Sequence, residues 1–159
     1  MAITLDQVKA LREVTGISIG KCKEALEEAN GDMEAAKAIL SKNSAASAAK
    51  KADRVLGAGT VGMYSHANGM IGSMVELLCE TDFVSNNAEF KTLAREIAMQ
   101  ISATAPEMVK SDNSEDADKC LIKQAYIKNP DKTIEVLLQE ATQKFGEKVE
   151  IGQMARFAI

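Results

Sequence analysis

Residues 60–84 read Thr-Val-Gly-Met-Tyr-Ser-His-Ala-Asn-Gly-Met-Ile-Gly-Ser-Met-Val-Glu-Leu-Leu-Cys-Glu-Thr-Asp-Phe-Val, and the architecture of the chain follows from them. The pattern predicts one strand from Thr60 to His66 and a second from Met70 to Cys79. The Asn68-Gly69 pair between them is a strong hairpin signal, because both residue types tolerate the positive φ angles of tight turns. The stretch therefore predicts an antiparallel hairpin.

The remainder of the chain after this hairpin predicts helices and one late strand. Apolar residues recur at helical spacing before Pro106, which predicts a helix. A weaker pattern indicates a polar helix over 114–128, and a further helix is predicted between Asp131, which can cap it, and Gly146, which ends it. Alternation from Val149 to Ile159 predicts a strand. We expect an α+β fold in which a three-stranded antiparallel sheet is covered by helices on one face. The residues of the first, most regular pattern are Phe90, Leu93, Ala94, Ile97, Ala98 and Ile101.

The first forty residues indicate three short helices. Thr4 and Gln7 have capping-box spacing, Gly16 ends the first helix, and Asp32 can cap the third. Residues 43–54 follow, and they are rich in Ala, Ser and Lys and lack large apolar side chains, so we expect a helical linker that contributes nothing to a core. The predicted division is a three-helix module over 1–42, a linker over 43–54 and an α+β core domain over 55–159.

Composition limits the classes of function. The chain has 159 residues and a net charge of −4, which argues against nucleic acid as the main partner. It shows no secretory signal and no apolar run long enough for a bilayer, so we expect a cytoplasmic protein without a membrane role. Three scattered cysteines and a single histidine, His66, do not match a zinc or disulfide framework, and we expect buried thiols, no metal and no cofactor.

Two enzymatic interpretations were weighed. Residues 57–62 match the dinucleotide fingerprint G-x-G-x-x-G, which would favour a small oxidoreductase if a helix followed them. Here the glycines lead into a predicted strand, so a structural role is favoured. Only His66 could serve a catalytic triad, and no serine or cysteine stands in a nucleophile elbow. We therefore expect a protein that is not an enzyme.

An acid and a large aromatic residue, Asp82 and Phe83, stand side by side on the connection after the second strand. An aromatic side chain on a surface connection is typical of an anchor for a partner. The alternative is that Phe83 folds back and caps the core, where large apolar side chains are usually found.

The motif Thr81-Asp82-Phe83-Val84, preceded by Glu76-Leu77-Leu78-Cys79-Glu80, resembles the signature of the elongation factor Ts family. Further matches are Leu11-Arg12-Glu13 with Thr15-Gly16, Asn30-Gly31-Asp32 and the Ala/Lys linker. The resemblance covers most of the chain and implies that the N-terminal module is a UBA-like three-helix bundle. It also implies a guanine-nucleotide exchange factor that binds elongation factor Tu with GDP.

The family resemblance also assigns roles to residues. Asp82 and Phe83 are expected to enter the nucleotide domain of elongation factor Tu and displace its Mg²⁺, while Thr81 and Val84 set the turn that presents them. Arg12, Ile19 and His66 are expected to make secondary contacts. The family's usual loop between the first two helices differs from residues 15–21 here, and the region after Met108 is shorter.

Two further expectations concern partners. Longer relatives carry two copies of the core lobe, so a non-covalent homodimer, with the final strand as a candidate interface, would restore the second surface. The alternative function, from a different class, is a UBA-like adaptor without exchange activity. A displaced or buried Asp82-Phe83 turn would favour this adaptor.

Overall fold

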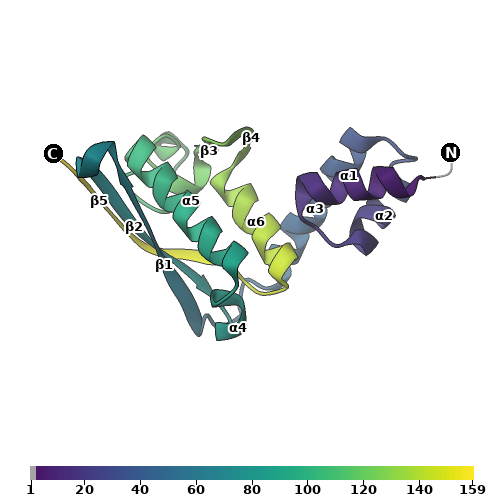
Figure 1. Cartoon of the computed structure of the whole chain (residues 1–159), viewed down its shortest axis with the longest axis horizontal. Helices are drawn as coiled ribbons and strands as arrows, with labels where there is room; N and C mark the ends of the chain where they lie inside the picture. The colour runs from purple at the N-terminus through teal and green to yellow at the C-terminus, as the bar shows by residue number, and fades with distance from the viewer. Residues whose placement is uncertain (1–2) are drawn as a thin grey trace.

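The computed structural model describes residues 3–159, which form an elongated molecule (Figure 1). A module of three helices occupies one end, and a sheet with its covering helices occupies the other. The elements are α1 (Leu5–Thr15), α2 (Ile19–Glu28), α3 (Met33–Lys50), β1 (Ala58–His66), η1 (Ala67–Gly69), β2 (Ile71–Cys79), α4 (Asp82–Ser85), α5 (Ala88–Thr104), η2 (Ser114–Asp116), η3 (Leu121–Lys123), β3 (Ala125–Tyr126), β4 (Asn129–Thr133), α6 (Ile134–Phe145) and β5 (Glu150–Ala158).

The ends of the first three helices follow the local sequence signals. The Thr4 hydroxyl accepts the N–H of Gln7 at 3.3 Å, and the Gln7 side chain accepts the N–H of Thr4 at 2.9 Å, which confirms the predicted capping box. Gly16 ends α1 with φ of 68°, and Asp32 caps α3 through the N–H of Ala35. These helices enclose a small core of their own, which consists of Val8, Leu11, Ile17, Cys22, Ala25, Leu26, Ala36 and Leu40.

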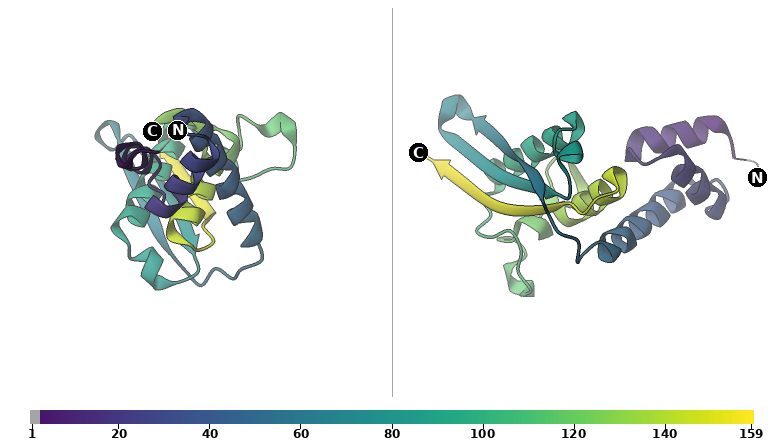
Figure 2. Two further views of the ribbon diagram at one scale, coloured as in Figure 1. Left: turned by 90° about the vertical axis from the view of Figure 1, so that its right-hand side faces the viewer. Right: turned by 90° about the horizontal axis from the view of Figure 1, so that it is seen from below.

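Helix α3 extends beyond the module and joins it to the rest of the molecule. It continues to Lys50, so most of the predicted linker is helical, as expected, and it lies beside α6 (Figure 2). The stretch adds no residue to either apolar core, as expected, but one of its polar side chains is buried. The Ser44 side chain is fully buried, bonds the Leu40 carbonyl and contacts the side chain of Gln143. Alanine and serine side chains are small, so α3 can approach α6 closely enough to bury this polar pair.

The three-stranded sheet has the order β1-β2-β5 and is antiparallel throughout. Its first hairpin pairs Ala58 with Cys79 at one end and His66 with Ile71 at the other. The predicted turn at Asn68-Gly69 is confirmed, although it is longer than two residues. Ala67, Asn68 and Gly69 all have positive φ and form the single 3-10 turn η1.

Helix α5 covers one face of this sheet, and the α+β class is confirmed (Figure 1). Close contact is possible because β1 carries Gly62 where α5 carries Ala94. A Cβ atom at Gly62 would collide with the backbone carbonyl group of Ala94. Beneath α5 lies the main core, which consists of Val75, Leu77, Cys79, Val84, Phe90, Leu93, Ala94, Ile97, Ala98, Ile101, Leu121, Tyr126, Ile134, Leu138, Ala141, Val149 and Ile151.

Two predictions between α5 and β5 are wrong. The segment 114–128 is not a helix but two 3-10 turns and the short strand β3, because its apolar residues are held by distant backbone. Leu121 donates its N–H to the carbonyl of Met108 at 2.9 Å, and its side chain is fully buried. Helix α6 is capped by Thr133, whose hydroxyl accepts the N–H of Val136, and not by Asp131, which lies within β4.

The glycines of residues 57–62 lead into β1 and not into a helix. A pyrophosphate site of the dinucleotide type needs a helix N-terminus after its glycines, so the oxidoreductase interpretation is wrong. In the chain from residue 3 onward, the model contains no helix with the length and apolar character needed to cross a lipid bilayer. The cysteines, all within the described residues, are buried and free, as predicted.

The close approach of α5 to β1 gives a stability prediction. Gly62→Ala should destabilise the fold by ~1–3 kcal/mol, because the added methyl group forces helix and sheet apart. The matched control is Gly72→Ala on β2, where the new Cβ has only ordinary contact, 3.8 Å from the Tyr64 carbonyl oxygen. Urea unfolding of both variants measures the difference, and equal midpoints would show that the Gly62 contact is unimportant.

Candidate partner-binding site

Residues 82–84 of the motif lie in the single helical turn α4, which is held on one side and exposed on the other. Val84 is only 4% exposed and belongs to the main core, and the adjacent Ser85 is also buried. Phe83 points away from this core and is 85% exposed. The prediction of an exposed aromatic side chain is confirmed, and the alternative that Phe83 caps the core is wrong.

Asp82 is the first residue of α4 and is exposed beside Phe83. Its main-chain carbonyl accepts hydrogen bonds from the Ser85 hydroxyl and the Asn86 N–H, which closes the turn. Its carboxylate makes no hydrogen bond or ion pair with any other described residue. The acid and the aromatic ring are therefore both presented to solvent by a turn whose backbone is fixed.

Thr81 precedes α4, and its side chain does not cap that turn. Instead, its hydroxyl donates to Glu147 Oε1 at 2.5 Å, and its N–H donates to Glu147 Oε2 at 3.0 Å. Its carbonyl accepts the thiol of Cys79 at 3.2 Å. Burial raises the pKa of the Cys79 thiol, and the charge of Glu147 raises this pKa further, so the thiol stays protonated and keeps this bond at neutral pH.

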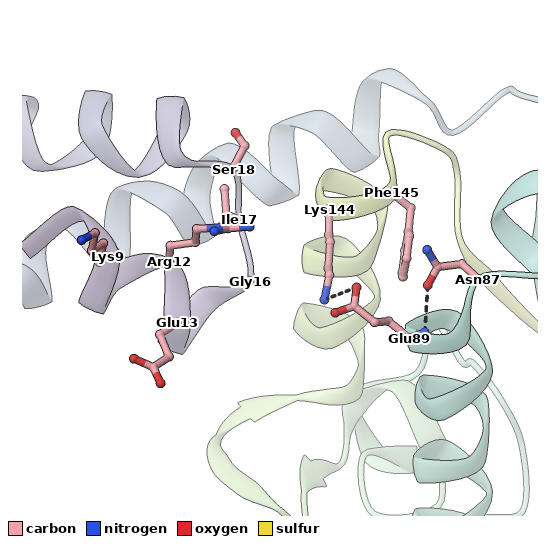
Figure 3. Close-up of a pocket in the computed structure, with 10 residues that line it drawn as sticks. All are labelled: Lys9, Arg12, Glu13, Gly16, Ile17, Ser18, Asn87, Glu89, Lys144 and Phe145. Atoms are coloured by element: carbon pink, nitrogen blue, oxygen red, sulfur yellow. Dashed lines mark hydrogen bonds and ion pairs between the residues drawn. The ribbon is translucent and has the colours of Figure 1, made fainter. Parts of the chain in front are cut away.

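Arg12 lies near the end of α1 and faces a cleft of about 680 Å³ between the three-helix module and the core domain. Figure 3 shows Arg12 on one side of this cleft and Glu89 and Lys144 on the other. Lys144 and Glu89 form an ion pair of 3.0 Å. Ile19 begins α2 within the same module and is 49% exposed, whereas Ile17, two residues earlier, is buried.

His66 is exposed at the C-terminal end of β1, beside the hairpin turn and far from the strand end that lies near α4. Its ring stacks on Tyr64 with 5.9 Å between centroids, and the Tyr64 hydroxyl lies 3.1 Å from His66 Nδ1. The guanidinium of Arg95 in turn lies over the Tyr64 ring at 5.6 Å. These contacts hold the histidine ring in one orientation at the sheet end.

The structure does not gather the expected contact residues into a single cluster. Asn87 lines both the cleft that contains Arg12 and the hollow beside Asp82 and Phe83, so these two places adjoin. His66 is eight residues of strand away from the α4 end of the hairpin, roughly 26 Å at 3.3 Å per residue. A partner that reached all three places would have to be a protein of domain size.

The chain is similar to known proteins over most of its length. The family model described as "Elongation factor TS" matches residues 6–118. An elongation factor Ts of Carboxydothermus hydrogenoformans is 42% identical, over 99% of this chain and 89% of its own length. Those of Leptospira biflexa and Geobacter sulfurreducens are 40% and 36% identical, over 100% of this chain and 98% and 90% of their own lengths.

The chain belongs to the elongation factor Ts family. It is therefore a protein of translation elongation, in a family of nucleotide exchange factors. The alignment with the Carboxydothermus relative runs over 193 positions, more than the 159 residues of this chain, so that elongation factor Ts contains residues that are missing here.

The structure also identifies residues around the family motif that sequence reasoning missed. Glu147 binds Thr81, and Glu80 binds Arg54 at 3.2 Å and the N–H of Lys148 at 2.7 Å. The only local signal was that Glu147 follows Gly146, the predicted helix end. Contacts across 66 residues of chain leave no spacing pattern, so these partners could not be found from the sequence alone.

The exposure of Phe83 predicts that its ring contributes little to folding. Phe83→Ala should change the free energy of unfolding by less than about 0.5 kcal/mol, whereas Phe90→Ala, at a fully buried ring that packs edge-on against Phe145, should cost ~3–5 kcal/mol. Urea unfolding measures the free energy of unfolding of both variants, and because both replace Phe with Ala, the difference reflects the environment of each ring. A loss at Phe83 as large as that at Phe90 would place the ring in the core in solution.

Proposed function

We propose that this chain binds elongation factor Tu in its GDP-bound form and accelerates the release of GDP. Asp82 and Phe83 enter the nucleotide domain and disturb the Mg²⁺ and phosphate site. Arg12 and Ile19 on the three-helix module, and His66 at the sheet end, make secondary contacts. The observation that carries the proposal is the geometry of α4, which fixes Val84 in the core and leaves Phe83 85% exposed.

The mechanism follows from the coordination chemistry of Mg²⁺. This ion demands near-octahedral oxygen coordination and bridges protein groups to nucleotide phosphates. A rigid aromatic ring inserted beside it shifts the surrounding residues, and a nearby carboxylate changes the local electrostatics. A modest displacement therefore removes much of the affinity for GDP. The exchange factor itself needs no bound nucleotide or metal for this role.

The adaptor interpretation receives less support. It would be favoured by a displaced or buried Asp82-Phe83 turn, whereas both side chains are exposed. An adaptor would also gain nothing from a solvent-facing aromatic ring on the core domain, whose exposure is unfavourable unless a partner covers it.

The test of the proposed function is release of fluorescently labelled GDP from elongation factor Tu. The chain should accelerate release, and Phe83→Ala should slow exchange by roughly 30- to 1,000-fold, the loss of a central aromatic anchor worth ~2–4 kcal/mol. Asp82→Ala should slow it less, because its effect is electrostatic. The control is Ile127→Ala, which truncates another exposed apolar side chain, at 41% exposure, away from α4.

Exchange also implies reciprocal coupling. If the factor weakens GDP binding, added GDP must weaken the complex of the factor with elongation factor Tu by the same ratio. A dissociation constant that stays unchanged as GDP is titrated contradicts the proposed function, as does an exchange rate unaffected by Phe83→Ala.

We also propose a non-covalent homodimer built on the core domain. Strand β5, the expected interface, lies at an edge of the three-stranded sheet and pairs only with β2. The sheet face opposite α5 adds exposed apolar side chains, namely Val61, Met63, Met74 and Phe157. Both features favour a second copy at this side of the molecule.

Sedimentation equilibrium tests the dimer. We expect a dimer at micromolar concentration that Met74→Glu converts to a monomer, because a buried unpaired carboxylate is costly. The control is Val14→Glu, at an exposed apolar residue on α1. A monomer with full exchange activity at that concentration would show that one lobe is sufficient.

A further inference from the structure

The carboxylate of Glu147 makes three hydrogen bonds to the start of the exchange motif. Its Oε2 atom accepts the N–H groups of Glu80 and Thr81 at 3.1 and 3.0 Å, and its Oε1 atom accepts the Thr81 hydroxyl at 2.5 Å. Glu147 stands in the connection between α6 and β5, so these bonds join that connection to the end of β2. Hydrogen bonds to a charged carboxylate are the strong ones in proteins.

The turn α4 needs such an external support. It has four residues, and a single helical turn fixes several dihedral angles in return for few hydrogen bonds, so it is unstable alone. Thr81 could have stabilised it as a capping residue, but its hydroxyl is bonded to Glu147. The orientation of the turn therefore depends on contacts with the rest of the protein, among them the buried Val84 side chain on one side and Glu147 on the other.

A second carboxylate links the same segments in the opposite direction. Glu80 accepts the N–H of Lys148 at 2.7 Å and the Arg54 guanidinium at 3.2 Å. The hydrogen bond from Lys148 lowers the pKa of the Glu80 carboxyl most, and the Arg54 guanidinium lowers this pKa further, so the group stays charged.

We propose that Glu147 is a positioning residue for nucleotide exchange, which holds the Thr81–Val84 turn so that Asp82 and Phe83 are presented in one fixed direction. This inference rests on the proposed function, in which those two side chains enter the partner. An anchor that is already ordered pays less conformational entropy on binding, so it binds more tightly for the same contacts. In this proposal Glu147 needs no contact with the partner or the nucleotide, because it acts through its bonds to Glu80 and Thr81.

The variants are Glu147→Ala, which removes all three bonds, and Glu147→Gln, which keeps one oxygen for the two N–H groups and can donate to the threonine hydroxyl. The control is Glu115→Ala, which removes an exposed glutamate from another loop; within residues 3–159 its carboxylate makes no hydrogen bond or ion pair. In the free protein, the N–H groups of Glu80 and Thr81 should exchange with deuterium roughly tenfold faster in Glu147→Ala.

GDP release should be slowed by roughly 10-fold in Glu147→Ala, largely restored in Glu147→Gln and unchanged in Glu115→Ala. The deciding comparison is made in a Phe83→Ala background. If Glu147 acts through the turn, removing it there slows residual release much less than in the wild-type chain, because the main anchor is already absent.

A purely structural role for Glu147 would give a lower melting temperature with an unchanged rate of release, or the same slowing in both backgrounds, and either result overturns the inference. Unchanged deuterium exchange at Glu80 and Thr81 in Glu147→Ala overturns it as well. Failure of the proposed function appears differently, as release that Phe83→Ala does not alter, and the deuterium measurement still decides whether Glu147 holds the turn.

Discussion

The close approach of α5 to β1 at Gly62 and Ala94 is the constraint on which the rest of the molecule depends. With the helix axis near the sheet, side chains as large as Phe90 and Ile97 are fully buried beneath it. The same approach orients α5 on the sheet, and α4 ends only three residues before this helix begins. The position of the Thr81–Val84 motif therefore depends on glycine in the neighbouring strand as well as on its own residues.

Within α4, the division between buried and exposed side chains separates stability from recognition. Val84 and Ser85 are the buried side chains of this turn, whereas the large apolar ring of Phe83 is exposed to water and makes no contribution to the core. Such exposure has a free-energy cost that only a partner can recover. The neighbouring Asp82 carboxylate, without a bond to another described residue, adds charge at the same point. This combination favours a site built to enter another protein over one built to hold a small molecule.

The parts of the fold that could be predicted from the sequence are those with local causes. Capping at Thr4 and Asp32, the turn at Asn68-Gly69 and the apolar period from Phe90 to Ile101 all act within a few residues. The helix predicted over residues 114–128 does not form, because the conformation there depends on a non-local hydrogen bond from Leu121 to the backbone of Met108. The burial of Ser44 in the linker could not be predicted either, because it depends on α6. For the site, the family motif was recognisable, but its support by Glu147 joins segments 66 residues apart.

A molecule that contacts its partner at several separated places gains affinity only if those places keep their spacing. Two features of this chain serve that end. Helix α3 runs without a break from the three-helix module to the core domain, where Ser44 meets Gln143 on α6. Just after α3, the carbonyl of Ala52 accepts the ammonium group of Lys148 at 2.7 Å. The backbone N–H of Lys148 donates to the Glu80 carboxylate beside the motif. The three-helix module that carries Arg12 is thus connected to the motif that carries Phe83 by the continuous helix α3 and by the hydrogen bonds among Ala52, Lys148 and Glu80. If both places contact the partner, as proposed, binding at one places the other near its target, and the second contact forms without a further loss of chain entropy.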